Sequence, residues 1–231
     1  MTDNPAGPGS IGTRHLTVPR TARYCTLGAS PAEARHLWIA LHGYAMLARS
    51  LARLLSPLAG PRTRVVVPEA LSRFYLETER TGRHGDLVGA TWLTREDRDR
   101  DLADHLGYLD RLLAAERAGL ASGTDVDLLG FSQGAVMAAR WVIAGAIVPR
   151  HLVLWGIVPP EDTIPGLADC MTGREVTLVA GTRDPLAPEG SLEALAATLA
   201  RHGVRARAER FDGGHSLSKE LLRQLGDTGH A

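Results

Sequence analysis

The 231-residue chain has the composition of an ordinary soluble globular protein, with 44% hydrophobic and 23% charged residues. Its 26 Lys and Arg residues balance 26 Asp and Glu residues, so no net field would concentrate nucleic acid or an anionic membrane around it. No stretch approaches the roughly 20 apolar residues that a membrane span requires. We therefore expect a small neutral molecule as partner, no nucleic acid and no membrane span; a homodimer is left open.

The N-terminus and the cysteines predict a cytoplasmic protein. Residues 1–13 lack the basic and apolar regions of a signal peptide. Cys25 and Cys170 are too few and too far apart for a disulfide framework, and no cysteine or histidine spacing suggests a metal site. We expect no metal and no cofactor. The predicted organisation is a flexible tail at 1–12 and a single domain over 13–228.

Hydrophobic periodicity divides the chain into short strands and amphipathic helices. In chain order we expect strands at 13–18, 22–27 and 36–42, a helix at 49–59, a strand at 63–69, a helix at 96–118, a strand at 125–131, a helix at 133–146, strands at 151–157 and 174–181, a helix at 189–203, a strand at 204–211 and a helix at 216–226. A long loop precedes the helix at 96–118. Residues 94–97 have the pattern of a capping box at its start.

This order of elements predicts an α/β fold. The central strands are continuously apolar, which is typical of strands covered on both faces, and their alternation with helices indicates a mostly parallel sheet. We therefore expect a three-layer α/β sandwich with antiparallel N-terminal strands. In such sheets ligands bind at the carboxyl ends of the strands, so the functional residues are sought there.

One strand end carries a serine in the sequence GFSQG at 130–134. The strand at 125–131 gives way to a helix directly after Ser132, which is the placement of a nucleophile elbow. Gly130 and Gly134 leave room for such a sharp turn. A glycine-rich chain can contain this pattern by chance, but chance does not place it between a strand and a helix. We predict Ser132 as a nucleophile.

A serine hydroxyl needs a base to take its proton. With a nucleophile elbow, the order along the chain is serine, acid, histidine. His202, His215 and His230 are the candidates for the base. His202 ends a helix and His230 lies in the tail, whereas His215 follows the last strand in the loop FDGGHSL. We therefore predict His215 as the base.

Three carboxylates compete to orient this base. Asp184 follows the strand at 174–181 in GTRDPLAP, and Asp162 follows the preceding strand. Asp212 lies in the turn beside His215. Placement at a strand end favours Asp184, although an Asp before a Pro is also a common turn residue.

Acyl transfer also needs hydrogen-bond donors for the oxyanion of the tetrahedral intermediate. One predicted donor is the backbone N–H of Gln133, directly after the serine. The other comes from the loop after the strand at 36–42, most simply the N–H of Tyr44. His42, in the same loop, is expected to hold the loop rather than to act in catalysis.

The segments LHGYA, GFSQGA, GTRDPLAP and GGHSL, in this order, resemble the phospholipase/carboxylesterase family of α/β-hydrolases. This family includes acyl-protein thioesterases and small bacterial carboxylesterases, and the resemblance covers about residues 35–225. It implies an α/β-hydrolase fold without a large cap domain, the triad Ser132, Asp184 and His215, no cofactor, and ester or thioester substrates. Tyr44 and the two residues after it depart from the Leu-Gly-Asp or similar sequence that often follows His-Gly in the family.

Phe74, Trp92 and Leu186 are the predicted substrate-binding residues. Residues 69–92 look like the family's variable loop over the active site, where Phe74 and Trp92 could wall an acyl pocket; packing of the loop itself is an equal alternative. Leu186 faces the pocket in relatives. The expected function is a serine carboxylesterase or thioesterase, with deacylation of lipidated proteins and peptidase activity as weaker variants. The alternative from another class is a small-molecule receptor on a hydrolase fold.

Overall fold

The computed structural model describes residues 12–77, 85–145 and 147–227. Its centre is a seven-stranded sheet in the order β1-β3-β2-β6-β7-β8-β9. Neighbouring strands are parallel, except that β1 pairs antiparallel with β3. Its strands are β1 (Tyr24–Gly28), β2 (His36–Leu41), β3 (Thr63–Pro68), β6 (Asp125–Phe131), β7 (His151–Trp155), β8 (Glu175–Gly181) and β9 (Arg205–Phe211). A separate antiparallel pair consists of β4 (Ser72–Tyr75) and β5 (Val88–Thr91).

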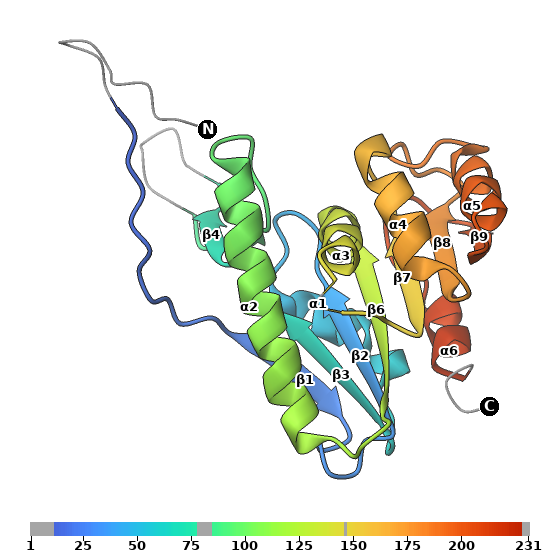
Figure 1. Ribbon diagram of the computed structural model, residues 1–231, viewed down its shortest axis with the longest axis horizontal. Helices are drawn as coiled ribbons and strands as arrows, with labels where there is room; N and C mark the ends of the chain where they lie inside the picture. Colours follow the sequence, from blue (N-terminus) through green and yellow to red (C-terminus); the bar gives the residue numbers. More distant parts are fainter. Residues whose placement is uncertain (1–11, 78–84, 146, 228–231) are drawn as a thin grey trace.

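Helices cover both faces of the large sheet, with α2 and α3 on one face and α1 on the other (Figure 1). The helices are α1 (Ala48–Leu54), α2 (Arg98–Gly119), α3 (Gln133–Ile143), α4 (Ile164–Met171), α5 (Ser191–Arg201) and α6 (Lys219–Asp227), with 3₁₀ turns at Ser56–Leu58 and Glu161–Thr163. One apolar core lies beneath α2 to α5 and a second beneath α1 and α6. The predicted three-layer α/β sandwich with a mostly parallel sheet is confirmed.

β2 illustrates why these apolar runs become central strands. All six of its residues are buried. Leu37 and Ile39 face the core beneath α2 and α3, while Trp38 faces the core beneath α1 and α6. Successive side chains of a strand point to opposite faces, so a strand covered on both sides is mainly apolar. The polar residue of β2, His36, is buried with its Nε2 2.9 Å from Oδ2 of Asp127. Each large apolar side chain buried in this way contributes about 1.5 to 3 kcal/mol.

Two local predictions near helix and strand starts are wrong. Residues 13–18 alternate in polarity, yet they are exposed and form no strand, because no neighbouring strand pairs with their backbone. The capping box at 94–97 is also absent. The Thr94 hydroxyl instead donates to the carbonyl of Glu96 at 2.8 Å, and Asp97 precedes α2 in a left-handed conformation without a side-chain cap.

Two elements were missed by the sequence prediction. β4 and β5 lie where a long loop was expected, and with four residues each they are too short for a clear periodicity. α4 contains Pro165 and Gly166, which disfavour helices, but the proline stands in the first turn, where its missing N–H costs nothing. The predicted tail at 1–12 lies outside the described residues except for its last position, as do 78–84 of the expected active-site loop.

Candidate active site

Ser132 occupies a sharp turn between β6 and α3. Its backbone has φ 54° and ψ −121°, a conformation that residues other than glycine rarely adopt. Two glycines leave room for this turn: a Cβ on Gly130 would lie 2.4 Å from the Cα of α3's third residue, and one on Gly134 would lie 2.2 Å from the carbonyl oxygen of Leu41 at the end of β2. The N–H of Ser132 donates to the carbonyl of Trp155 at 2.7 Å, which fixes the turn against β7.

The side chains of Ser132, His215 and Asp184 form one hydrogen-bonded chain. His215 Nε2 lies 2.9 Å from Ser132 Oγ, and His215 Nδ1 lies 2.8 Å from Asp184 Oδ2. When Nδ1–H donates to the carboxylate, Nε2 is left free to accept the serine proton. The carboxylate of Asp184 is buried, and its Oδ1 accepts the N–H of Leu186 at 3.0 Å. This geometry suits a serine activated by a neighbouring base.

Close backbone contacts hold the loop that carries His215. The imidazole stacks on the ring of Phe131 with centroids 5.0 Å apart. The backbone of Gly156 lies so close to the imidazole that a Cβ at this position would lie 3.0 Å from Cε1 of His215. A Cβ on Gly181 would lie 2.3 Å from the carbonyl oxygen of Gly213, so the two loops that carry the acid and the imidazole touch. The side chain of His215 remains 30% exposed, which leaves the site open to solvent.

The rival candidates make other contacts. The Nδ1 of His202 hydrogen-bonds a carbonyl within the last turn of α5. Asp162 forms an ion pair with an arginine of α3, and Asp212 forms one with Arg183. His230 lies outside the described residues.

Two backbone N–H groups beside the serine have no hydrogen-bond acceptor within the described part of the chain. Gln133 is the first residue of α3, where the helix itself provides no acceptor for the N–H. The N–H of Tyr44 is likewise unpaired. A Cβ on Gly43 would lie 3.2 Å from the Cβ of Ser132, so the loop that carries Tyr44 passes directly beside the serine. Both N–H groups are thus available at this edge of the sheet.

His42 holds this loop, as expected. The imidazole is fully buried, its Nε2 accepts the N–H of Ala70 at 3.0 Å, and its Nδ1 lies 2.8 Å from the carbonyl of Gly43. Burial lowers the pKa of His42 to about 4, so the ring is neutral near pH 7. Since Nε2 accepts a hydrogen bond from a backbone N–H, the ring proton is on Nδ1, which donates a hydrogen bond to the carbonyl of Gly43.

The prediction that Trp92 lines a substrate pocket is wrong. Its side chain has 0% exposed surface. The indole N–H donates to the carbonyl of His42 at 2.8 Å, and the ring packs against the imidazoles of His42 and His105 at centroid distances of 5.1 and 5.2 Å. Trp92 therefore stabilises the loops around the site, which is the packing alternative.

Phe74 and Leu186 retain exposed surface at the same edge of the sheet. The half-buried ring of Phe74 lies 5.3 Å from the ring of Tyr44, which is 59% exposed. Leu186 is 49% exposed, and its backbone binds the carboxylate of Asp184. Phe74 therefore lies beside the loop that carries Tyr44, and Leu186 lies beside the carboxylate that His215 contacts.

Sequence reasoning missed the side chain of Gln133. Its Oε1 accepts the N–H of Trp92 at 2.9 Å, and its Nε2 donates to the carbonyl of Leu93 at 2.8 Å and to the hydroxyl of Thr91 at 3.0 Å. The side chain thereby fastens the end of β5 to the start of α3. Its partners lie 40 to 42 positions away in the chain, and no pattern within a short stretch of sequence predicts contacts over that separation.

Across residues 12–77, 85–145 and 147–227, no group of three or more His, Cys, Asp or Glu side chains could hold a metal ion. In the same residues no helix is both long and apolar enough to cross a membrane.

Comparison with known proteins adds a likeness in structure. Neither the protein-family models nor the curated proteins give a match. Among solved structures, esterase PE8 is 23% identical, with a TM-score of 0.63 over 90% of this chain and 98% of its own. Zea mays acyl-protein thioesterase 2 is 17% identical, with a TM-score of 0.65 over 90% and 97%. The Bacillus cereus carboxylesterase is 17% identical, with a TM-score of 0.63 over 90% and 93%. The strand order, the strained serine turn and this likeness over nearly whole chains show that the protein has the α/β-hydrolase fold.

Proposed function

We propose that this protein is a serine hydrolase that cleaves carboxylic esters or thioesters through an acyl-Ser132 intermediate. The observation that carries the proposal is the hydrogen-bonded chain from Ser132 Oγ through His215 to Asp184, at 2.9 and 2.8 Å. Such a chain activates a weakly nucleophilic hydroxyl, because the histidine takes its proton and the carboxylate orients the histidine, so that the oxygen can attack a carbonyl carbon at neutral pH. The likeness in fold to proteins named as esterases and a thioesterase supports the same reaction class.

In the acylation step, Ser132 Oγ attacks the carbonyl carbon of the substrate while His215 Nε2 takes the hydroxyl proton. Asp184 stabilises the resulting imidazolium and keeps the ring oriented. The oxyanion that forms on the former carbonyl oxygen accepts hydrogen bonds from the N–H groups of Tyr44 and Gln133. His215 then gives its proton to the leaving alcohol or thiol, and the C–O or C–S bond breaks.

In the deacylation step, a water molecule attacks the acyl-Ser132 ester. His215 takes a proton from this water and returns it to Ser132 Oγ as the carboxylic acid leaves. The partly exposed imidazole gives water direct access, so the site needs no separate channel. Atoms and protons balance without a metal or an organic cofactor.

The substrate-facing residues in this proposal are Tyr44, Phe74 and Leu186. Their exposed apolar surface suits a small or medium acyl group better than a charged one. The polar groups of the substrate bind the backbone N–H groups of Tyr44 and Gln133 or remain in contact with solvent.

Labelling with a fluorophosphonate tests the proposal most directly. We expect wild-type protein to be labelled at Ser132, the Ser132→Ala variant to be unlabelled, and a Ser191→Ala variant, which alters the first residue of α5, to be labelled as wild type. Turnover of p-nitrophenyl acetate and butyrate should follow the same order. Equal labelling of all three proteins, or none of the wild type, would overturn the proposal. Ligand-induced stabilisation without turnover would instead support the receptor alternative.

A further inference from the structure

The loop at 43–47 joins β2 to α1 and has an unusual backbone. Ala45 has φ 63°, a left-handed conformation that is unfavourable for a residue with a Cβ. Its middle is tied to β5: the N–H of Ala45 donates to the carbonyl of Ala90 at 2.9 Å, and the N–H of Ala90 donates to the carbonyl of Met46 at 3.2 Å. A loop in such a conformation keeps its shape only where its ends are also held.

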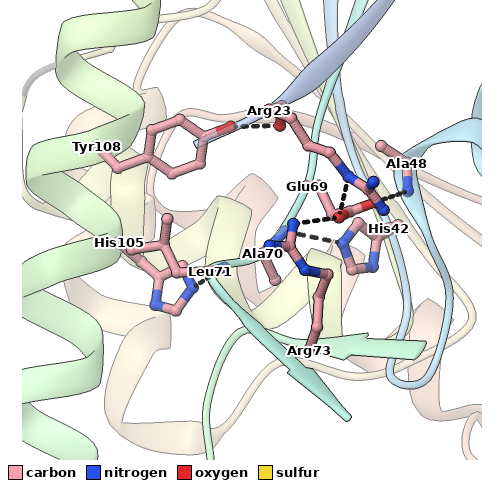
Figure 2. A network of polar contacts seen from close by, with 9 residues as sticks. All are labelled: Arg23, His42, Ala48, Glu69, Ala70, Leu71, Arg73, His105 and Tyr108. Atoms are coloured by element: carbon pink, nitrogen blue, oxygen red, sulfur yellow. Dashed lines mark hydrogen bonds and ion pairs between the residues drawn. The ribbon is translucent and has the colours of Figure 1, made fainter. Parts of the chain in front are cut away.

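Two consecutive residues after β3, Glu69 and Ala70, bind both ends of this loop (Figure 2). At its start, the N–H of Ala70 donates to Nε2 of His42 at 3.0 Å. At its end, Oε2 of Glu69 accepts the N–H of Ala48 at 3.2 Å. His42 and Ala48 immediately flank 43–47. The segment after β3 therefore fixes the distance between the two ends of the loop.

The carboxylate of Glu69 is 2% exposed and lies between two guanidinium groups (Figure 2). Arg23 donates from Nε to Oε1 at 2.5 Å and from Nη2 to Oε2 at 3.1 Å, and Arg73 donates to Oε1 at 3.2 Å. Burial alone raises the pKa of Glu69, but the hydrogen bonds from Arg23, Arg73 and Ala48 outweigh it and lower the pKa. The carboxylate is therefore ionised near neutral pH and remains an acceptor only.

The segment that carries Glu69 and the residue that binds its carboxylate, Arg23, are both attached to α2. The hydroxyl of Tyr108 donates to the carbonyl of Arg23 at 3.1 Å, and Nε2 of His105 accepts the N–H of Leu71 at 3.0 Å. Both side chains project from the 22-residue helix, His105 toward Leu71 and Tyr108 toward the backbone of Arg23 (Figure 2). Glu69 thus transmits the position of a long helix to the loop beside Ser132.

We propose that Glu69 is a positioning residue, which fixes the loop at 43–47 so that the N–H of Tyr44 points at the oxyanion. This inference rests on the proposed function. Glu69 would touch no substrate atom and would act through Ala48. An oxyanion donor must lie about 2.7 to 3.1 Å from the oxygen, and a misplacement of about 1 Å can cost about 100-fold in rate. Loss of the Glu69 charge should therefore lower kcat and leave KM nearly unchanged.

Glu69→Gln keeps the size of the side chain and removes its charge. Glu116→Gln is the matched control, because Glu116 is also nearly fully buried and is bound by Arg64 through two hydrogen bonds of 2.7 and 3.3 Å, at the opposite end of β3. We expect Glu69→Gln to lower kcat by about 10- to 100-fold and to change KM by less than about threefold. A trifluoromethyl ketone, which forms a tetrahedral adduct with serine, should lose affinity by the same factor as kcat. Glu116→Gln should change all three quantities by less than about threefold.

Amide hydrogen exchange gives a second measurement that does not depend on turnover. Peptides that cover residues 42–49 should exchange at least about tenfold faster in Glu69→Gln than in wild type or Glu116→Gln, since local opening becomes easier. Arg73→Gln, which removes one exposed partner of the carboxylate, should change kcat and exchange in the same direction by a smaller factor, and it decides the matter if Glu69→Gln does not fold.

Wild-type kcat and exchange in these variants, or a change confined to KM, would overturn the positioning role. If wild-type protein does not turn over esters at all, the proposed hydrolase function fails, and the exchange comparison alone decides whether Glu69 holds the loop.

Discussion

The side-chain oxygen of Gln133 accepts the N–H of Trp92 at 2.9 Å and so fastens the loop after β5 to the residue that follows the serine. Gln133→Ala should lower the free energy of unfolding by about 1 to 3 kcal/mol, because the backbone groups of Trp92 and Leu93 lose their partner in a partly buried place. Urea denaturation measures this change. Gln224→Ala, on the exposed face of α6, should stay within about 0.5 kcal/mol of wild type, and an equal loss in both variants would contradict the prediction.

Asp184→Asn should leave the fold intact and lower kcat by about 10³- to 10⁴-fold, because an amide can present an N–H to the ring and favour the tautomer in which Nε2 cannot accept the serine proton. Ester turnover and the rate of fluorophosphonate labelling report the effect. Asp212→Asn, which alters an exposed carboxylate paired with Arg183, should keep kcat within a few-fold of wild type. Comparable losses in the two variants would argue against the role of Asp184.

Gly134→Ala should destabilise the protein by about 3 kcal/mol or more, because its Cβ would lie 2.2 Å from the carbonyl oxygen of Leu41, and backbone must move to admit it. Gly107→Ala is the matched substitution in α2, where a Cβ meets nothing within 4 Å. It should stabilise the protein by about 0.5 to 1 kcal/mol, since alanine is the better helix former. Thermal denaturation of both variants distinguishes close packing from a general intolerance of glycine replacement.

Stability should fall on mild acidification. Burial lowers the pKa of His42 and of His151 to about 4, against 6.5 for an exposed histidine. Above pH 6.5 the two rings are mostly neutral in both the folded and the unfolded protein. As the pH falls toward 4, the unfolded chain binds protons that the folded protein does not, which favours unfolding. Between pH 7 and pH 5 each ring should remove about 2 kcal/mol. Denaturant titrations at these two values test the sum.

Replacement of His151 distinguishes its contribution to the pH dependence of stability from that of His42. His151 lies on β7 with its Nε2 2.8 Å from the hydroxyl of Thr177, so His151→Gln keeps a polar partner there and should lose about half of the pH dependence. An unchanged slope in His151→Gln would contradict the assignment.

The sequence predicted the features that depend on short-range patterns. Largely apolar runs identified β2, β6, β7 and β8, because strands covered on both faces consist mainly of apolar residues. Strand ends then placed Ser132, Asp184 and His215 at one edge of the sheet, where the structure brings the three side chains within hydrogen-bond distance.

Features that depend on distant partners could not be predicted in this way. The predicted strands at 13–18 and 22–27 alternate alike, but only the second segment pairs with β3, through residues 24–28. Trp92 could wall a pocket or pack beneath a loop, and the difference lies in contacts with His42 and His105. The position of Glu69 depends on Arg23, which lies 46 positions earlier in the chain and is brought against it only by folding.

The residues of the proposed site follow strands that are added to the sheet at very different times during synthesis. Ser132 follows β6, whereas His215 lies 83 positions later and follows β9, at the edge of the sheet. A nascent chain that has emerged from the ribosome only through β8 contains Ser132 but lacks His215, the base of the proposed triad. The proposed ester cleavage should therefore appear only once β9 and the loop after it have been synthesised. Truncated fragments that end before this loop should not cleave esters, even where they are folded.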